Sequence, residues 1–156
     1  MNADPAVMEH LSGLMTREQS DAFIDASEAF WEEHGYGRWA VEVPGEAECI
    51  GFVGIHTLSY MPKDEIGWRI AQRYWGHGYA TEAARAALGD GFERIGLDEI
   101  VSVTVPANTR SRRVMERIGM KHDPTRDFEH PRFPPGHRLS RHVLYAMTHE
   151  QWLRTG

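Results

Sequence analysis

Apolar residues recur along this chain with two different periods, and each period predicts a different kind of element. Thr16 is followed three residues later by Gln19, a capping box that begins an amphipathic helix, and Gly35 ends that helix. Helical spacing returns over residues 81–95 and 109–118. Alternating or β-branched segments predict strands at residues 39–43, 49–57, 65–70, 98–105 and 142–147.

The remaining segments are shorter or irregular. Asp4 followed by Pro5 is typical of a helix start, with a capping carboxylate and proline at the first helical position. Residues 44–46 form the turn of a hairpin, residues 121–140 are rich in proline and predict a loop or loose hairpin, and residues 149–153 form a short terminal piece. Because no repeat or linker interrupts the chain, we expect one domain.

One stretch, residues 65–82, joins a strand to a helix through a glycine turn. Gly76 and Gly78 bracket a tight reversal, and helical spacing begins at Ala80. Backbone N–H groups at a helix start have no partner within the helix, and the helix dipole adds positive potential there. The stretch therefore predicts an anion site, most simply for phosphate. The turn lacks the spacing of dinucleotide-binding and P-loop motifs, so the predicted cradle is of a third type.

Glycine and proline also interrupt the regular elements. Gly51 and Gly54 lie inside a predicted strand, where glycine marks a bulge or the close approach of another group. Gly89 and Gly91 weaken the long helix by about 1 kcal/mol each relative to alanine, and the sequence offers no functional reason for them. Pro106 stops regular pairing after the fourth strand, so that strand cannot pair along its whole length.

Composition excludes several classes of function. The formal net charge of −6 and the pI near 5.8 argue against a nucleic-acid partner and suit a basic amine or peptide. The single cysteine, Cys49, cannot form an internal disulfide, which favours the cytoplasm, and no apolar stretch is long enough to cross a membrane. The spacing of His130, His137 and His142 is too irregular for a metal site, and no Gly-x-Ser-x-Gly elbow supports Ser-His-Asp hydrolysis.

Arginines gather on the helix predicted after Pro106. Arg110, Arg112, Arg113 and Arg117 fall within eight residues of an acidic chain. Taken alone, these arginines fit a solvated helix face that pairs with nearby carboxylates as well as they fit a phosphate contact. Together with the glycine turn, they favour a contact to the phosphates of a cofactor.

Two blocks of the sequence resemble a known family in the right order and separation. Arg73-x-x-Gly76-x-Gly78 is similar to the Gln/Arg-x-x-Gly-x-Gly/Ala signature of the GCN5-related N-acetyltransferases, the GNAT family. The block of residues 108–120 is similar to the Asn-x-x-Ser and Gly-Phe/Met block that follows in that family. The resemblance covers residues 4–152, and it is strongest to the branch that acetylates ribosomal-protein N-termini.

The resemblance implies an α/β (α+β) GNAT fold, a mixed and mostly antiparallel twisted sheet flanked by helices, with acetyl-coenzyme A (acetyl-CoA) as co-substrate and no metal. In this family two central parallel strands splay apart, the pantetheine arm fills the gap, and backbone amides of the glycine turn hold the pyrophosphate. The expected cofactor contacts include two arginines of the predicted helix, Arg112 and Arg113. The others are Trp68, Arg69, Ile70, Arg73, Gly76, His77, Gly78, Tyr79, Ala80, Asn108 and Ser111.

Acyl transfer also needs an oxyanion donor and groups that manage two protons. The resemblance places an N–H near Ile70 at the thioester carbonyl and Ser111 at the departing thiolate. Many relatives carry a tyrosine acid where this chain has Met115, and some carry a glutamate base where it has Val103, so both standard proton carriers are missing. Glu65 is the candidate water-mediated base, and its alternative role is a surface carboxylate at a strand end.

The lack of the usual glutamate base limits how basic the acceptor amine can be. A thiol with a pKa near 8.5 can leave as thiolate with the help of a serine hydroxyl. An α-amine, with a pKa of about 7.7 to 8.0, is already partly neutral at pH 7, whereas lysine at about 10.4 needs roughly 3 to 4 kcal/mol more to deprotonate. The sequence therefore favours an N-terminal or otherwise weakly basic amine.

A second departure concerns the first strand of the family. Family members open with a strand before the segment that residues 4–8 resemble, and this chain begins at that segment. We expect the sheet to lack the first family strand, which leaves residues 39–43 as an exposed edge. A homodimer partner over this edge, a start codon placed after the true gene start, or a partly dismantled acceptor site would each account for the difference.

These observations predict an acetyl-CoA-dependent N-acetyltransferase that forms one domain over residues 1–156 and acetylates a primary amine by direct attack. The amine is a protein or peptide N-terminus or a small molecule. Two alternatives stay open: a catalytically impaired module that only binds acyl-CoA, and a nucleotide-binding protein unrelated to acyl transfer. Thiol release with an amine distinguishes the enzyme from the module, and binding of ATP in place of coenzyme A identifies the third.

Overall fold

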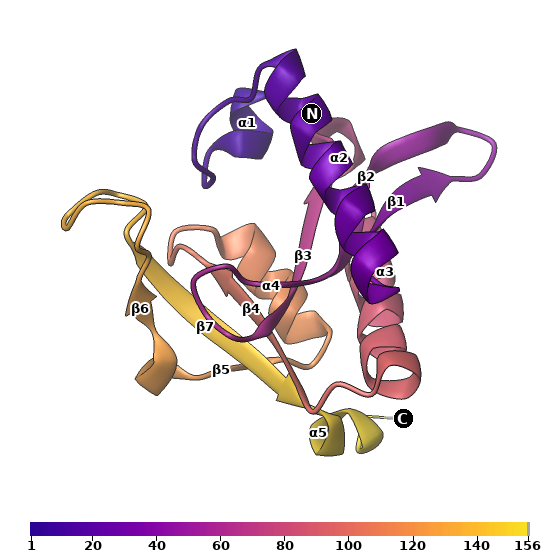
Figure 1. The fold of residues 1–156 in the computed structure, drawn as a ribbon, viewed down its shortest axis with the longest axis vertical. Coiled ribbons are helices and arrows are strands. Elements are labelled where there is room, and N and C mark those ends of the chain that lie inside the picture. The colour runs from indigo at the N-terminus through magenta and orange to yellow at the C-terminus, as the bar shows by residue number, and fades with distance from the viewer. Residues whose placement is uncertain (156) are drawn as a thin grey trace.

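The strands form a sheet in the order β1-β2-β3-β4-β7-β5, with β6 paired to β7 (Figure 1). In this computed structural model, which describes residues 1–155, every strand pair is antiparallel except β3 with β4. The predicted mixed, mostly antiparallel sheet is confirmed. The strands are β1 Arg38–Val43, β2 Ala47–Thr57, β3 Asp64–Ile70, β4 Glu99–Thr104, β5 Lys121–His122, β6 Phe128–Glu129 and β7 Arg141–Thr148.

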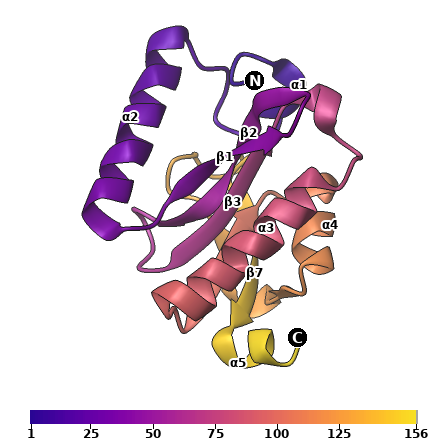
Figure 2. The ribbon, with the colours of Figure 1, turned by 90° about the vertical axis from the view of Figure 1, so that its right-hand side faces the viewer.

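Helices cover both sides of this sheet. The helix α2 lies on one side, and α3 and α4 lie on the other (Figure 2). The small residues of α3 let it approach the sheet closely, so Ala84, Ala87 and Leu88 are completely buried. The helices are α1 Pro5–Met8, α2 Arg17–His34, α3 Tyr79–Gly89, α4 Thr109–Arg117 and α5 His149–Leu153, with 3-10 turns at Gln72–Tyr74 and Pro124–Arg126.

The long helix predicted over residues 81–95 begins earlier and ends in a different geometry. After α3, Asp90–Ile95 continue as a π-helix. A Cβ atom on Gly91 would lie 2.6 Å from the Cδ1 atoms of both Ile100 and Ile55. Glycine therefore lets this end of the helix settle onto the sheet, a packing reason that only the structure reveals.

The helix α2 is capped as predicted but less buried than predicted. The reciprocal bonds of Thr16 and Gln19 are present, and Gly35 ends the helix in the left-handed conformation. No residue of α2 is fully buried, and Ile24, which belongs to the predicted apolar stripe, is 51% exposed. The stripe is only partly covered because α2 rests on the sheet mainly through its aromatic residues, such as Phe23 on Phe52.

Both glycines of β2 lie where neighbouring backbone leaves no room for a side chain. A Cβ on Gly51 would be 2.0 Å from the carbonyl oxygen of Arg69, and a Cβ on Gly54 would be 2.1 Å from that of Gly37. The predicted close approach is confirmed, and it comes from backbone on either side of β2.

The parallel pair β3 and β4 separates almost at once. Glu65 opposite Val101 is the single bridge between these strands, although β4 continues to pair with β7 as far as Thr104. Beyond the bridge, the Ser102 hydroxyl donates to the carbonyl oxygen of Ile66 at 2.9 Å. The gap between the strands thus opens well before Pro106, so this proline follows the gap and does not create it.

At one edge of the sheet, β1 pairs only with β2 among the described strands. The indole of Trp31 donates to the carbonyl oxygen of Arg38 at 2.8 Å, which satisfies one backbone group at the start of this edge. The expected exposed edge at residues 39–43 is therefore present, and a second copy of the chain over it stays a prediction.

We expect Gly54→Ala to lower the free energy of unfolding by about 2 to 3 kcal/mol, because backbone atoms cannot yield to the new methyl group. Gly67→Ala is the matched control: Gly67 lies opposite Gly54 on β3, and a Cβ there meets nothing within 4 Å. Its stability should change by about 1 kcal/mol or less. Urea unfolding measures both, and equal losses would contradict the close approach.

Candidate active site

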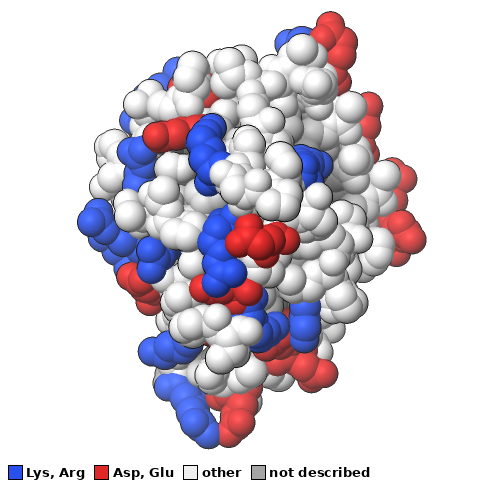
Figure 3. Space-filling model, turned by 90° about the vertical axis from the view of Figure 1, so that its left-hand side faces the viewer, with Lys and Arg blue, Asp and Glu red and all other residues white. Residues whose placement is uncertain are grey.

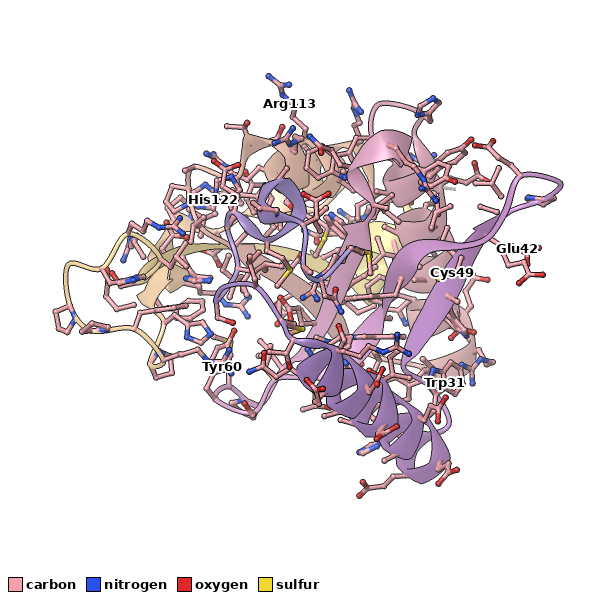
Figure 4. All side chains as sticks on the ribbon, turned by 90° about the horizontal axis from the view of Figure 1, so that it is seen from above. Trp31, Glu42, Cys49, Tyr60, Arg113 and His122 are labelled. Carbon is pink, nitrogen blue, oxygen red and sulfur yellow. The ribbon has the colours of Figure 1, made fainter. Side chains whose placement is uncertain are left out.

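A cavity of about 1010 Å³ opens where β3 and β4 separate. Its wall includes β3, the glycine turn, α4, the segment after α1, and the loop between β6 and β7. Arg113 and Tyr60 both line it and lie on opposite sides of the molecule when seen from above (Figure 4). The cavity therefore connects two distant surfaces through the gap in the sheet.

The glycine turn presents free backbone amides to this cavity. Gly76 and Gly78 adopt positive φ angles of 82° and 87°, and the start of α3 has no side-chain cap. Within residues 1–155, the N–H groups from Gly76 to Ala80 donate to no protein acceptor, and the first bond of this helix start runs from Glu82 to Gly78. This geometry is that of an anion site at a helix N-terminus.

Arginines of α4 add positive charge beside the turn. Arg110 and Arg113 line the cavity, and the Arg110 guanidinium lies 4.0 Å from the centre of the Trp75 ring. Arg112, an expected cofactor contact, instead donates to the Tyr145 hydroxyl at 3.2 Å and to the carbonyl oxygen of Pro106 at 3.1 Å. Arg112 is therefore held away from the cavity by these two bonds, whereas its neighbour Arg113 lines it.

Of the other expected cofactor contacts, some line the cavity and some do not. Arg73 lies over the Tyr74 ring at 4.9 Å, and the ring nitrogen Nδ1 of His77 is 3.0 Å from the carbonyl oxygen of Trp75, so neither side chain forms part of the cavity wall. The expected contacts that do line the cavity are Trp68, Arg69, Ile70, Gly76, Gly78, Tyr79, Ala80, Asn108, Ser111 and Arg113.

Asn108 is held in place by one bond within α4 and one to the end of β4. Its Oδ1 accepts from the Ser111 N–H at 3.3 Å as the cap of α4, and its Nδ2 donates to the Thr104 hydroxyl at 3.0 Å. Met115, at the position of the family tyrosine, is buried in the core with 1% exposure. Ser111, in the first turn of α4, also lines the cavity.

Glu65 sits at the point where the strands part. Its Oε1 accepts from the N–H of Val103 at 3.3 Å, and its Oε2 lies 3.4 Å from Nε2 of His56. The side chain is only 13% exposed, and this burial raises the pKa of Glu65 to about 7. Burial, aided by the charge of Arg38, lowers the pKa of His56 to about 3, so that imidazole is neutral.

Several residues of the cavity wall were not predicted from the sequence. His56, Arg38, Phe23, Phe52 and Tyr60 line the same cavity as Glu65. The antiparallel register places His56 directly opposite Glu65 and Phe52 directly opposite Arg69. A histidine inside an apolar strand was the available signal, but only the register shows which residue it faces.

Among residues 1–155, no group of three or more potential ligand side chains could hold a metal ion. In the same residues, no helix combines the length and apolar character needed to cross a bilayer.

Comparison with known proteins connects this cavity to an activity. A family model described as "Acetyltransferase (GNAT) domain" matches residues 1–121. The chain belongs to the GNAT acetyltransferase family. It is 30% identical over 151 residues to the uncharacterized N-acetyltransferase YnaD of Bacillus subtilis, covering 96% of this chain and 85% of that protein.

Two further relatives agree. FsC-acetyl coenzyme A-N(2)-transacetylase of Aspergillus fumigatus is 34% identical over 131 residues, which cover 77% of this chain and 53% of the fungal protein. The crystal structure of a GNAT-family acetyltransferase from Bacillus anthracis superimposes with a TM-score of 0.78 at 30% identity, covering 96% of this chain and 85% of that one. The chain is thus an acetyl-CoA-dependent acyltransferase. This finding contradicts the hypothesis of a nucleotide-binding protein unrelated to acyl transfer, and it does not favour the hypothesis of a module that only binds acyl-CoA.

Ionisation of Glu65 should oppose folding of the acetyltransferase. Its pKa is about 7 when folded against an ordinary value of 4.5, so the folded protein holds this proton more tightly. The resulting stability is complete below about pH 4.5 and is lost as the pH rises through about 7, by at most about 3 kcal/mol. The Glu65→Gln variant has no carboxylate to ionise and does not lose this stability. The difference between its free energy of unfolding and that of the wild type should therefore increase as the pH rises through about 7.

Urea unfolding at each pH measures this difference. His56 contributes with the opposite sign, because its lowered pKa makes folding more favourable as the pH rises toward 6.5. Since His56 is present in both proteins, subtracting the two curves isolates Glu65. A difference that stays constant from about pH 5 to about pH 8 would contradict the raised pKa.

Proposed function

We propose that the acetyltransferase transfers the acetyl group of acetyl-CoA to a primary amine by direct attack, with Glu65 as the general base. One observation carries the proposal: a single cavity contains both the free amides of the glycine turn and the Glu65 carboxylate at the separation of β3 and β4. The turn fits a diphosphate, and the carboxylate has the pKa of a base that works near neutral pH.

The residues present suit acetyl-CoA. Amides from Gly76 to Ala80 would bind its pyrophosphate, with Arg110 and Arg113 beside them. The gap between β3 and β4 would receive the pantetheine arm, because its edge groups are not paired across the sheet. The bound molecule supplies an activated thioester.

The chain's own residues then manage the protons. The amine nitrogen forms a bond to the carbonyl carbon, the carbon–sulfur bond breaks, and the proton leaving the amine goes to the Glu65 carboxylate, directly or through a water. His56 stays neutral, so its Nε2, 3.4 Å from Oε2 of Glu65, contacts the carboxylate without neutralising its charge. Ser111 is the hydroxyl on the cavity wall that would donate to the departing thiolate.

The wider setting is also a proposal. Residues 1–156 would form one acetyltransferase domain, consistent with the single sheet of the described residues. The lone Cys49 is exposed and unpaired, which suits the reducing cytoplasm. Membership of the ribosomal-protein branch stays a prediction, as does an N-terminal amine.

Gly78→Val should weaken binding of acetyl-CoA about 10- to 100-fold, because a branched side chain would cover the amides of the turn. Titration calorimetry with acetyl-CoA measures the loss. Gly45→Val is the matched control: Gly45 has a similar φ of 79°, has free space around its Cβ position, and lies in the hairpin turn outside the cavity. Both variants carry similar strain, so equal binding by the two would contradict the cradle.

Glu65→Gln should lower kcat/KM about 10²- to 10⁴-fold while acetyl-CoA binding stays unchanged. In the wild type, log kcat/KM should rise with pH through about 7 as Glu65 loses its proton. The variant should lose this limb and keep only the limb of the amine itself, near pH 8 for an α-amine. Thiol release followed at each pH tests this, and an unchanged limb near 7 would exclude Glu65 as the base.

A further inference from the structure

Two arginines share one aromatic site on the cavity wall. The Arg38 guanidinium lies 5.0 Å from the centre of the Phe23 ring and 5.8 Å from that of Phe52. The Arg69 guanidinium lies 5.4 Å and 5.2 Å from the same two rings. All four side chains line the cavity, so two positive groups and two ring faces surround one part of it.

This part of the wall is separate from the phosphate cradle. Along β3, Ile66 and Ile70 are buried in clusters that include α3 and the start of that helix. Because side chains alternate along a strand, Glu65, Gly67 and Arg69 face the opposite side of the sheet, toward α2. Arg69 and Glu65 are therefore on one face, and the residues of the α3 start are on the other.

Neither arginine forms an ion pair with a carboxylate of the described residues, although the charge of Glu65 acts on Arg38 from a longer distance. Among residues 1–155, no carboxylate oxygen lies within 4.0 Å of either guanidinium. Arg69 donates only to Oδ1 of Asn2 at 2.8 Å and to the sulfur of Met15 at 4.0 Å, and its Nε is buried without a partner. Burial together with the charge of Arg38 lowers the pKa of Arg69 to about 10. Charges withdrawn from water in this way need an anion.

We propose that the acceptor is an amine that carries its own carboxylate, bound by Arg38 and Arg69 while its amino group faces Glu65. This inference rests on the proposed function. Guanidinium groups bind a carboxylate through paired hydrogen bonds, and their aromatic neighbours hold them in place. Gly67 lies between Glu65 and Arg69 on the same face, and free space around its Cβ position leaves room for the molecule.

The same charges disfavour a cationic acceptor. A polyamine or basic peptide would bring further positive charge to two guanidinium groups that already repel each other. The acidic net charge of the chain does not offset this, because the acidic side chains of the described residues do not pair with either guanidinium. Figure 3 shows acidic side chains along one edge of the face drawn and others beside Lys and Arg over the rest of it. The expectation of a basic partner from net charge therefore does not extend to the cavity.

The test compares amines that differ only in the carboxylate. Thiol release with acetyl-CoA is measured for each common amino acid and for its amide, with spermidine and ethanolamine phosphate as the polyamine and the phosphate-bearing amine. We expect at least one amino acid to exceed its amide about 10- to 100-fold in kcat/KM. Equal rates for acid and amide, or preference for spermidine or for the phosphate, would overturn the proposal.

Variants identify the residues responsible. Arg38→Met and Arg69→Met should each reduce the preference for acid over amide to about twofold or less. Acetyl-CoA binding should be retained, because the cofactor contact expected of Arg69 is made by its backbone. Arg17→Met is the control, because Arg17 is on α2, 85% exposed and paired with Asp21, and it should keep the full preference. A preference that survives both cavity variants would exclude these arginines.

A second measurement separates this inference from the proposed function. Without ligand, Arg69→Met should raise the melting temperature by several degrees, because it removes a buried charge that forms no ion pair, whereas Arg17→Met should not. At least one amino acid of the panel should raise the melting temperature of the wild type but not of Arg69→Met, whether or not it reacts. If acetyl-CoA binds and no amine reacts, the proposed function fails, and these shifts still decide whether a carboxylate binds here.

Discussion

The separation of β3 from β4 after a single bridge is the constraint on which the rest of the site depends. A parallel pair that opens inside a sheet leaves backbone groups without partners, and the protein must satisfy them by other means. Ser102 bonds the carbonyl oxygen of Ile66 across the opening, and the Glu65 carboxylate accepts from the N–H of Val103. The carboxylate that closes the structure at this point is therefore also the group that faces the cavity.

This double role explains the chemistry available at Glu65. A carboxylate on a strand end is normally solvated and fully ionised near pH 7. Here the packing around the opening removes it from water, and burial outweighs the hydrogen bond from Val103 and the charge of Arg38 in setting its pKa. The strand geometry that opens the gap would thus also supply the proposed base, in the absence of the glutamate that some relatives are expected to carry at the position of Val103.

The elements and the glycine turn could be predicted from the sequence, but the residues that surround Glu65 could not, for a physical reason. Glycine turns, caps and strand periods are local, so the turn at Gly76 and Gly78 and the order of elements could be predicted from the chain itself. Contacts such as Glu65 with His56 depend on strand register, and the choice between Arg112 and Arg113 depends on how α4 is rotated. Packing between distant segments sets both, and a single sequence does not encode them in any local pattern.

Glu65 and Arg38 act on each other electrostatically within the same buried region. The charge of Arg38 lowers the pKa of Glu65, which opposes the effect of burial. A carboxylate bound between Arg38 and Arg69 would neutralise part of that field, so the pKa of Glu65 would rise further when the acceptor is present. Glu65 would then take a proton from the amine more readily in the complex than in the free enzyme. A negatively charged acceptor would in this way strengthen the base that activates it.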